Sequence, residues 1–218
     1  MSTLFITATD TGAGKTTVAC ALLRTLRAQG LDACGFKPVA SGCELTPNGL
    51  RNDDALALMA AAPNTARYVD VNPYAFVPAI APHLAAAAAG VCISATALNA
   101  AHAALAAQHS YILAEGAGGW LTPLSDTLLL GDWVAERGWP VLLVVGMRLG
   151  CLNHALLTAA AIERQTRLAG WVANVGPESM PELAGNLVTL SQRLGPPLWV
   201  HSKQSLAPNE ALQALFTA

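Results

Sequence analysis

Eight residues near the start of the chain, Thr9-Asp10-Thr11-Gly12-Ala13-Gly14-Lys15-Thr16, have the composition and spacing of a phosphate-binding loop. Gly12 and Gly14 allow the backbone to curl, so that its N–H groups and the start of the next helix offer partial positive charge to a phosphate. Lys15 would reach the β- and γ-phosphate oxygens, and the Thr16 hydroxyl would bind Mg²⁺. An ordinary helix start after a glycine is the alternative, and the flanking elements favour phosphate binding.

The loop departs from two standard patterns. The first glycine of G-x-x-x-x-G-K-[ST] would fall on Thr9, and the second lysine of the partition-ATPase variant would fall on Asp10. An acidic residue at that place argues against the partition ATPases and for a more specialised branch.

The elements that must position this loop alternate along the chain. Apolar runs predict strands at Leu4–Ala8, Ala33–Val39, Tyr111–Glu115, Val141–Gly146 and Leu168–Asn174. Helical patterns follow at Gly14–Gln29, Asp53–Ala62, Ser94–Gln108, Gly131–Arg137, Leu152–Arg167, Pro181–Leu194 and Asn209–Phe216. The alternation predicts an α/β fold: one P-loop NTPase domain over residues 1–218, with a mostly parallel β-sheet and helices on both faces.

Polar or glycine-rich residues follow the strands at several places, where ligands bind on parallel sheets. Lys37 lies near the end of the second strand and precedes the small loop that contains Ser41. Glu115 ends the third strand and runs into Gly116-Ala117-Gly118-Gly119. A lysine that reaches solvent along its apolar stem is the alternative for Lys37, and a helix cap or surface charge is the alternative for Glu115.

An oxygen-rich set of side chains could hold Mg²⁺, which prefers a few oxygen ligands besides phosphate and water. Thr16, Asp54 and Glu115 would supply three such ligands. Asp54 follows Asn52 and Asp53 at the start of a helix, and we expect at least one of those two residues to cap that helix.

Composition excludes several classes of function. The 12 Lys and Arg residues are spread along a chain of net charge −2, so no basic face for nucleic acid is expected. The Ala-rich stretch Leu84 to Ala107 is interrupted by polar residues and predicts two packed helices rather than a membrane span. No basic, apolar leader precedes the first strand, so we expect a cytoplasmic protein. The cysteines and histidines show no metal-site spacing, and the tryptophans are expected in the core or an interface.

Several motifs in order make the chain similar to the dethiobiotin synthetases, ATP-dependent carboxylases of biotin synthesis. The resemblance spans nearly the whole chain and rests on Thr9-Asp10-Thr11 before Gly14-Lys15-Thr16, Phe36-Lys37-Pro38-Val39-Ala40-Ser41-Gly42, Asn52-Asp53-Asp54-Ala55, Val71-Asn72-Pro73-Tyr74, Pro82-His83, Glu115-Gly116-Ala117-Gly118-Gly119-Trp120, Gly150-Cys151-Leu152-Asn153-His154 and Gly170-Trp171-Val172-Ala173-Asn174.

The resemblance implies 7,8-diaminononanoate, CO₂ and ATP with Mg²⁺ as the small molecules bound. A carbamate formed on one amine would attack the γ-phosphate, and the second amine would close the ureido ring from a carbamic–phosphoric anhydride. Lys15, Lys37 and Thr11 would be catalytic. Thr11, Lys37 and Ser41 would bind the reacting end of the substrate.

The resemblance also places nucleotide contacts beyond the glycine loop. The implied set is Gly12, Ala13, Gly14, Lys15, Thr16, Thr17, Glu115, Gly116, Ala117, Gly118, Asn174, Leu198, Trp199 and Val200, with Asn174 and the last three along the adenine.

A further site is expected at the start of a helix, where Gly150, Cys151, Leu152 and Asn153 would offer N–H groups to the substrate carboxylate. In the family this site is reached across a two-fold interface, so the resemblance implies a homodimer with shared active sites.

The chain departs from its relatives at Ala8, where many carry Gly, at Gly12, where they often carry Glu, and in the segment Val200 to Ala218. One rival function is an ATP-driven switch that dimerises to bind a partner, and Asp10 counts against it. Another is a glutamine-dependent amidotransferase of the cobyric-acid type, for which 218 residues leave no room for the second domain.

Overall fold

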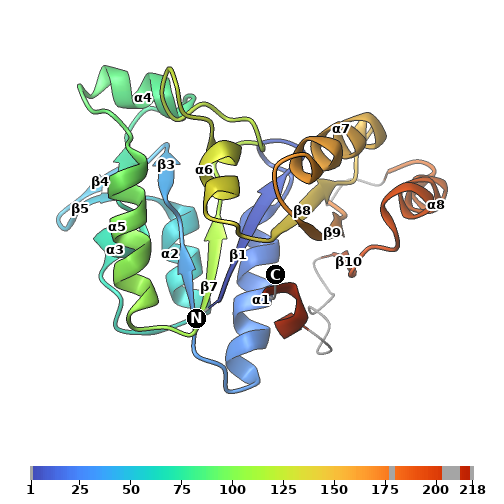
Figure 1. Ribbon diagram of the computed structural model, residues 1–218, viewed down its shortest axis with the longest axis horizontal. Coiled ribbons are helices and arrows are strands. Elements are labelled where there is room, and N and C mark those ends of the chain that lie inside the picture. Colours follow the sequence, from blue (N-terminus) through green and yellow to red (C-terminus); the bar gives the residue numbers. More distant parts are fainter. Residues whose placement is uncertain (1, 177–179, 203–211, 217–218) are drawn as a thin grey trace.

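A parallel six-stranded sheet forms the centre of the protein (Figure 1). The computed structural model describes residues 2–176, 180–202 and 212–216. In spatial order the strands are β10 (Val200–His201), β9 (Leu168–Asn174), β8 (Val141–Gly146), β1 (Ser2–Ala8), β7 (Tyr111–Glu115) and β2 (Ala33–Phe36). Every neighbouring pair is parallel, which confirms the predicted fold class.

Two hydrophobic clusters cover the two faces of this sheet. Along β1, Leu4 and Ile6 belong to one cluster and Phe5 to the other, because successive strand residues point to opposite faces. The first face is covered by α1 (Lys15–Ala28), α2 (Asp53–Ala61) and the short 3₁₀ helix η1 (Leu212–Phe216). The second is covered by α5 (Ala95–Ala106), α6 (Leu130–Glu136), α7 (Cys151–Glu163) and α8 (Leu183–Leu194) (Figure 1).

The predicted strand Ala33–Val39 is wrong in its last part, because β2 ends at Phe36. Pro38 has no N–H to donate to a strand ladder, so it interrupts the pairing. The Lys37 N–H donates instead to the Val71 carbonyl at 2.8 Å. A new strand, β3 (Val39–Ser41), pairs with β6 (Tyr74–Phe76) in a separate two-stranded sheet.

The region between β3 and α5 holds further small elements that the sequence did not predict. They are the hairpin of β4 (Glu44–Thr46) and β5 (Gly49–Arg51) and the one-turn helix α3 (Tyr68–Val71). The Ala-rich stretch forms two helices as predicted, α4 (Pro82–Ala88) and α5. None of the helices in the described parts of the chain has the length and apolar character needed to cross a membrane.

The C-terminal prediction is confirmed only in part. Of the predicted helix Asn209–Phe216, the first residues lie outside the described part, and Leu212–Phe216 is a 3₁₀ helix rather than an α-helix. Its Phe216 packs edge-on against Tyr111 at a ring distance of 5.2 Å. The five tryptophans are buried as expected.

Candidate active site

The glycine loop turns tightly between β1 and α1 and lies against the end of β9. Gly14 precedes α1 with φ of +94°, a left-handed conformation that favours glycine. A Cβ at this position would lie 2.0 Å from the Asn174 side-chain nitrogen. Asn174 in turn donates from Nδ2 to the Ala13 carbonyl at 2.9 Å. The loop is therefore anchored to a neighbouring strand end, and its geometry leaves no room for a side chain at Gly14.

Lys15 is buried within this loop although its ammonium forms no ion pair with a carboxylate of the described residues. Its Nζ donates to the Gly118 carbonyl at 2.8 Å and to the Asp10 carbonyl at 3.5 Å. Burial lowers the pKa of Lys15 to about 8, and the nearby charge of Lys37 acts in the same direction. An ammonium held only by carbonyl oxygens is suited to receive an anion such as a phosphate group.

Four side chains from different elements converge beside the loop. Lys37 Nζ lies 2.6 Å from Glu115 Oε1 and 2.8 Å from Asp54 Oδ2. The Thr16 hydroxyl lies 2.8 Å from Asp54 Oδ1 and 2.8 Å from Glu115 Oε1. Lys37 and Glu115 are 3% and 0% exposed, so the ion pair is shielded from water. The predicted Mg²⁺ ligands and the predicted catalytic lysine are thus brought together.

Within this cluster, interactions between charges affect the pKa values more strongly than burial does. Burial alone would lower the pKa of Lys37, but Glu115 and Asp54 outweigh it and raise the pKa above its ordinary value. Burial would raise the pKa of Asp54, but the charge and hydrogen bond of Lys37 hold it below the ordinary value. Both groups are therefore charged near neutral pH. The alternative in which Lys37 extends toward solvent is excluded by its burial.

The position of Asp54 follows from the helix cap before it. Asn52 Oδ1 accepts from the Ala55 N–H at 3.2 Å, which confirms that Asn52 caps α2. Asp54 then lies in the first turn of α2, on the side that meets α1 at Thr16.

The oxygens of this cluster fit a divalent cation. The Thr16 hydroxyl carries one proton, yet it lies within 2.8 Å of an oxygen of both Asp54 and Glu115. Glu115 Oε2 is buried and has no hydrogen-bond partner among the described residues. A buried carboxylate oxygen without a partner is costly, and a cation would satisfy it. Hydroxyl and carboxylate oxygens are the ligands that Mg²⁺ prefers.

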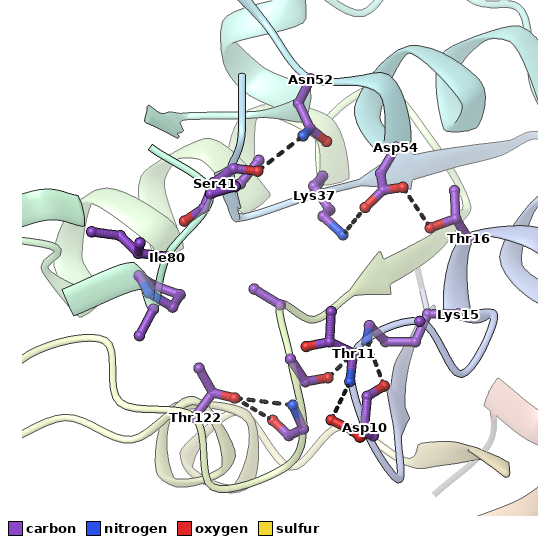
Figure 2. Close-up of a pocket in the computed structure, with 18 of the residues that line it drawn as sticks. Asp10, Thr11, Lys15, Thr16, Lys37, Ser41, Asn52, Asp54, Ile80 and Thr122 are labelled. Carbon is purple, nitrogen blue, oxygen red and sulfur yellow. Dashed lines mark hydrogen bonds and ion pairs between the residues drawn. The ribbon is translucent and has the colours of Figure 1, made fainter. Parts of the chain in front are cut away.

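A cavity of about 890 Å³ opens in front of the loop and this cluster. Figure 2 shows Thr11 and Lys15 on one side of the open space and Lys37 and Ser41 on another. The Ser41 hydroxyl is buried and has no hydrogen-bond partner in the described part of the chain. Thr11, Lys37 and Ser41, the predicted contacts for the reacting end of a substrate, therefore share one cavity.

The sequence prediction missed one wall of the cavity. Ala79, Ile80 and Ala81 line it from the segment before α4, and Thr122 and Pro123 line it from the loop after Gly119. Most of these side chains carry no reactive group, so residue type gave no signal. The indication in the sequence was that these residues adjoin two of the family motifs, Pro82-His83 and the motif from Glu115 to Trp120.

Several predicted contacts do not line this cavity. Asn174 contacts the loop at the Ala13 carbonyl. Leu198, Trp199 and Val200 lie along the edge of the sheet, where the Leu198 N–H donates to the Trp171 carbonyl at 2.9 Å. The predicted carboxylate site of Gly150, Cys151, Leu152 and Asn153 also lies outside it.

The start of α7 differs from expectation at one residue. The Cys151 N–H donates to the Arg148 carbonyl at 3.0 Å, so it is already engaged in a turn. Leu152 and Asn153 remain the predicted donors of the first helical turn. Arg148 also forms an ion pair with Asp10 and thereby ties this turn to the glycine loop.

Comparison with known proteins adds independent information. Residues 2–199 match the family described as AAA domain. The ATP-dependent dethiobiotin synthetase BioD of Pseudescherichia vulneris is 53% identical over 171 residues, which cover 78% of this chain and 71% of that protein. The protein of the same name from Pseudomonas paraeruginosa is 52% identical over 199 residues, which cover 90% of this chain and 87% of that protein.

Solved structures with low sequence identity share the fold. A ParA family ATPase from Chlorobium tepidum has a TM-score of 0.55 at 12% identity and covers 93% of this chain and 85% of that one. The signal recognition particle receptor FtsY from Elizabethkingia anophelis has a TM-score of 0.52 at 13% identity and covers 99% of this chain and 65% of that one. At these identities the likeness shows the fold alone.

Proposed function

Because this chain belongs to the ATP-dependent dethiobiotin synthetase family, we propose that it carboxylates and cyclises 7,8-diaminononanoate, using CO₂ and ATP to give dethiobiotin, ADP and phosphate. It is then a ligase of biotin biosynthesis. The observation that best supports this chemistry is that a phosphate-binding loop and the two buried lysines Lys15 and Lys37 share one cavity.

The described side chains suit the sequence of steps. A carbamate forms on one amine, and its oxygen attacks the γ-phosphorus as the bond to ADP breaks. The second amine then attacks the carbamate carbon, closes the ring and releases phosphate. Lys15 and Lys37 neutralise charge on the transferring group, while the hydroxyls of Thr11 and Ser41 orient the carbamate. Catalysis of phosphoryl transfer depends mainly on such positioning and neutralisation.

Thr16, Asp54 and Glu115 are the residues that would hold Mg²⁺, which would offset the negative charge of the phosphate groups. Two observations support this assignment: their oxygens converge, and Glu115 Oε2 has no hydrogen-bond partner in the part of the chain that the structure describes. Gly12, Ala13, Gly14 and Thr17 would contact the phosphates through the loop, together with Gly116, Ala117 and Gly118 after β7.

Asn174 and residues 198–200 would contact the adenine. The Asn174 Nδ2 is engaged by the Ala13 carbonyl, which leaves the amide oxygen to accept a hydrogen bond from the base.

The substrate carboxylate would bind at the start of α7 of a second subunit, so we propose a homodimer. This is supported by the position of Leu152 and Asn153 outside the cavity of their own chain. A two-fold axis can place such a site beside the partner's loop. We also propose that residues 1–218 form one domain that acts in the cytoplasm on small molecules, without nucleic acid or membrane.

Subunit mixing tests the shared site. In the proposed dimer each site combines the loop of one subunit with the start of α7 of the other. Lys15→Ala breaks the first part and Asn153→Pro the second, so each variant alone should be inactive. The proline removes one N–H in the first helical turn, where proline is tolerated. Random exchange makes about half of the dimers mixed, each with one intact site, so about a quarter of wild-type activity should return. Confirmed exchange without recovered activity would show that each subunit builds its own site.

The dependence of ATP hydrolysis on the diamine tests the proposed reaction. We expect phosphate release well above background only when diaminononanoate and bicarbonate are both present. Release that is equal without the diamine would instead support a nucleotide switch of the partition-ATPase kind.

A further inference from the structure

The cluster of Lys37, Asp54 and Glu115 holds its lysine where the proposed cation would bind. Lys37 Nζ contacts one oxygen of each carboxylate, at 2.8 and 2.6 Å. Glu115 Oε1 is in addition the oxygen that lies 2.8 Å from the Thr16 hydroxyl. The same oxygen therefore serves both the ammonium and the set of proposed Mg²⁺ ligands.

Lys37 offsets one of the two negative charges in this arrangement. Two carboxylates, one of them 0% exposed, face a single ammonium that is 3% exposed. A buried carboxylate without a counter-ion is strongly unfavourable, so Lys37 stabilises the pair when no metal is present. A divalent cation on the same oxygens would repel this ammonium at short range.

We propose that Lys37 is a resident counter-ion of the metal site, which gives up Asp54 and Glu115 when a divalent cation binds and then turns its ammonium toward the reacting phosphate. Lys37 is one of the residues that line the cavity, and we expect a change of its side-chain rotamer to redirect the ammonium. Lys37 Nζ also donates to the Gly116 carbonyl at 3.3 Å, directly before Ala117 and Gly118, which line the cavity. The lysine is thus withheld from substrate until the metal is loaded. This inference rests on the proposed assignment of Thr16, Asp54 and Glu115 as metal ligands.

Metal affinity without nucleotide is the direct test, with Mn²⁺ as the probe and electron paramagnetic resonance as the readout. Lys37→Met should bind Mn²⁺ at least about tenfold more tightly than the wild type, equal to about 1.4 kcal/mol. The matched control is Lys15→Met, which also removes a cavity lysine, but one whose Nζ donates to the Asp10 and Gly118 carbonyls rather than to a carboxylate of the described residues. It should change the affinity by less than about threefold, about 0.7 kcal/mol.

The outcomes separate the two proposals. Suppose that Asp54→Asn abolishes Mn²⁺ binding but Lys37→Met binds Mn²⁺ no more tightly than the wild type. The proposed metal site is then supported, and the proposed release of the carboxylates by Lys37 is refuted. An equal gain in Mn²⁺ affinity in Lys15→Met would also refute it, because the loss of any nearby positive charge would then explain the gain. If wild-type Mn²⁺ binding does not depend on Asp54, or no variant binds Mn²⁺, both proposals are refuted.

A second measurement uses the wild-type side chain, because Lys37→Met leaves the buried Glu115 carboxylate without its ion-pair partner and can fail to fold. In protein labelled with ¹⁵N at lysine, the ion-paired ammonium of Lys37 should give a resolved signal without metal, identified by its loss in Lys37→Arg. Saturating Mg²⁺ should shift or remove this signal. A signal that is missing without metal, or that Mg²⁺ leaves unchanged, would overturn the proposal.

Discussion

Acid should destabilise this protein through His102, a buried histidine in α5. The ring is 1% exposed, and its Nε2 lies 2.9 Å from the Thr3 hydroxyl. It packs against Trp139 at a ring distance of 4.5 Å. Burial lowers the pKa of His102 to about 4, and the charge of Arg137 adds to the effect. The folded protein therefore keeps this histidine neutral where the unfolded chain would protonate it.

The magnitude follows from the two pKa values. The pKa is 6.5 in the unfolded chain and about 4 in the folded protein, so the unfolded chain binds more protons between these values. The free energy of unfolding is then fully retained above pH 6.5 and falls as the pH drops toward 4. Between pH 8 and pH 5 the loss from this one group amounts to about 2 kcal/mol.

Urea unfolding at several pH values measures this loss. His102→Gln keeps a polar group near Thr3 but does not titrate, so its stability should fall by about 2 kcal/mol less than that of the wild type between pH 8 and pH 5. His154 is exposed, and His154→Gln should follow the wild-type curve. Equal losses in the wild type and His102→Gln would refute the reasoning.

Other predictions concern the active site. Lys15→Ala and Lys37→Ala should each lower diamine-dependent phosphate release by about 10²–10³-fold, since each removes one preorganised charge; near-normal turnover in either variant would contradict its assigned role. Glu115→Gln should raise the Mg²⁺ concentration for half-maximal rate at least about tenfold, since it removes the charge of a proposed ligand; an unchanged Mg²⁺ requirement would assign Glu115 a structural role. Gly14→Ala should lower the melting temperature and weaken ADP binding measured by calorimetry, because its Cβ would meet the Asn174 amide at 2.0 Å. Unchanged ADP binding in Gly14→Ala would show that the loop tolerates a side chain.

Patterns of apolar residues predicted the central sheet well. Five of its strands carry continuous apolar runs, because both faces of a parallel sheet are covered by helices. The short strands β3 to β6 gave no such signal. They have three residues each, and their pairing depends on contacts between distant segments, such as Val39 with Tyr74.

The candidate site was predictable where residue type carries chemistry. Lys37, Asp54 and Glu115 were singled out from strand ends and a helix start, and the structure brings them within hydrogen-bond distance. What the sequence could not show is the pairing itself, since the fold alone places Lys37 between two carboxylates. The apolar cavity wall at Ile80 was missed because no reactive group marks it.

The fate of the carbonate carbon tests the proposed activity most directly. The protein is incubated with diaminononanoate, ¹³C-bicarbonate and Mg-ATP, and the products are analysed by mass spectrometry together with released phosphate. We predict dethiobiotin with the label in its ureido carbon and an equal amount of phosphate. Phosphate release without labelled dethiobiotin, or no reaction of the folded protein, would contradict the proposed function.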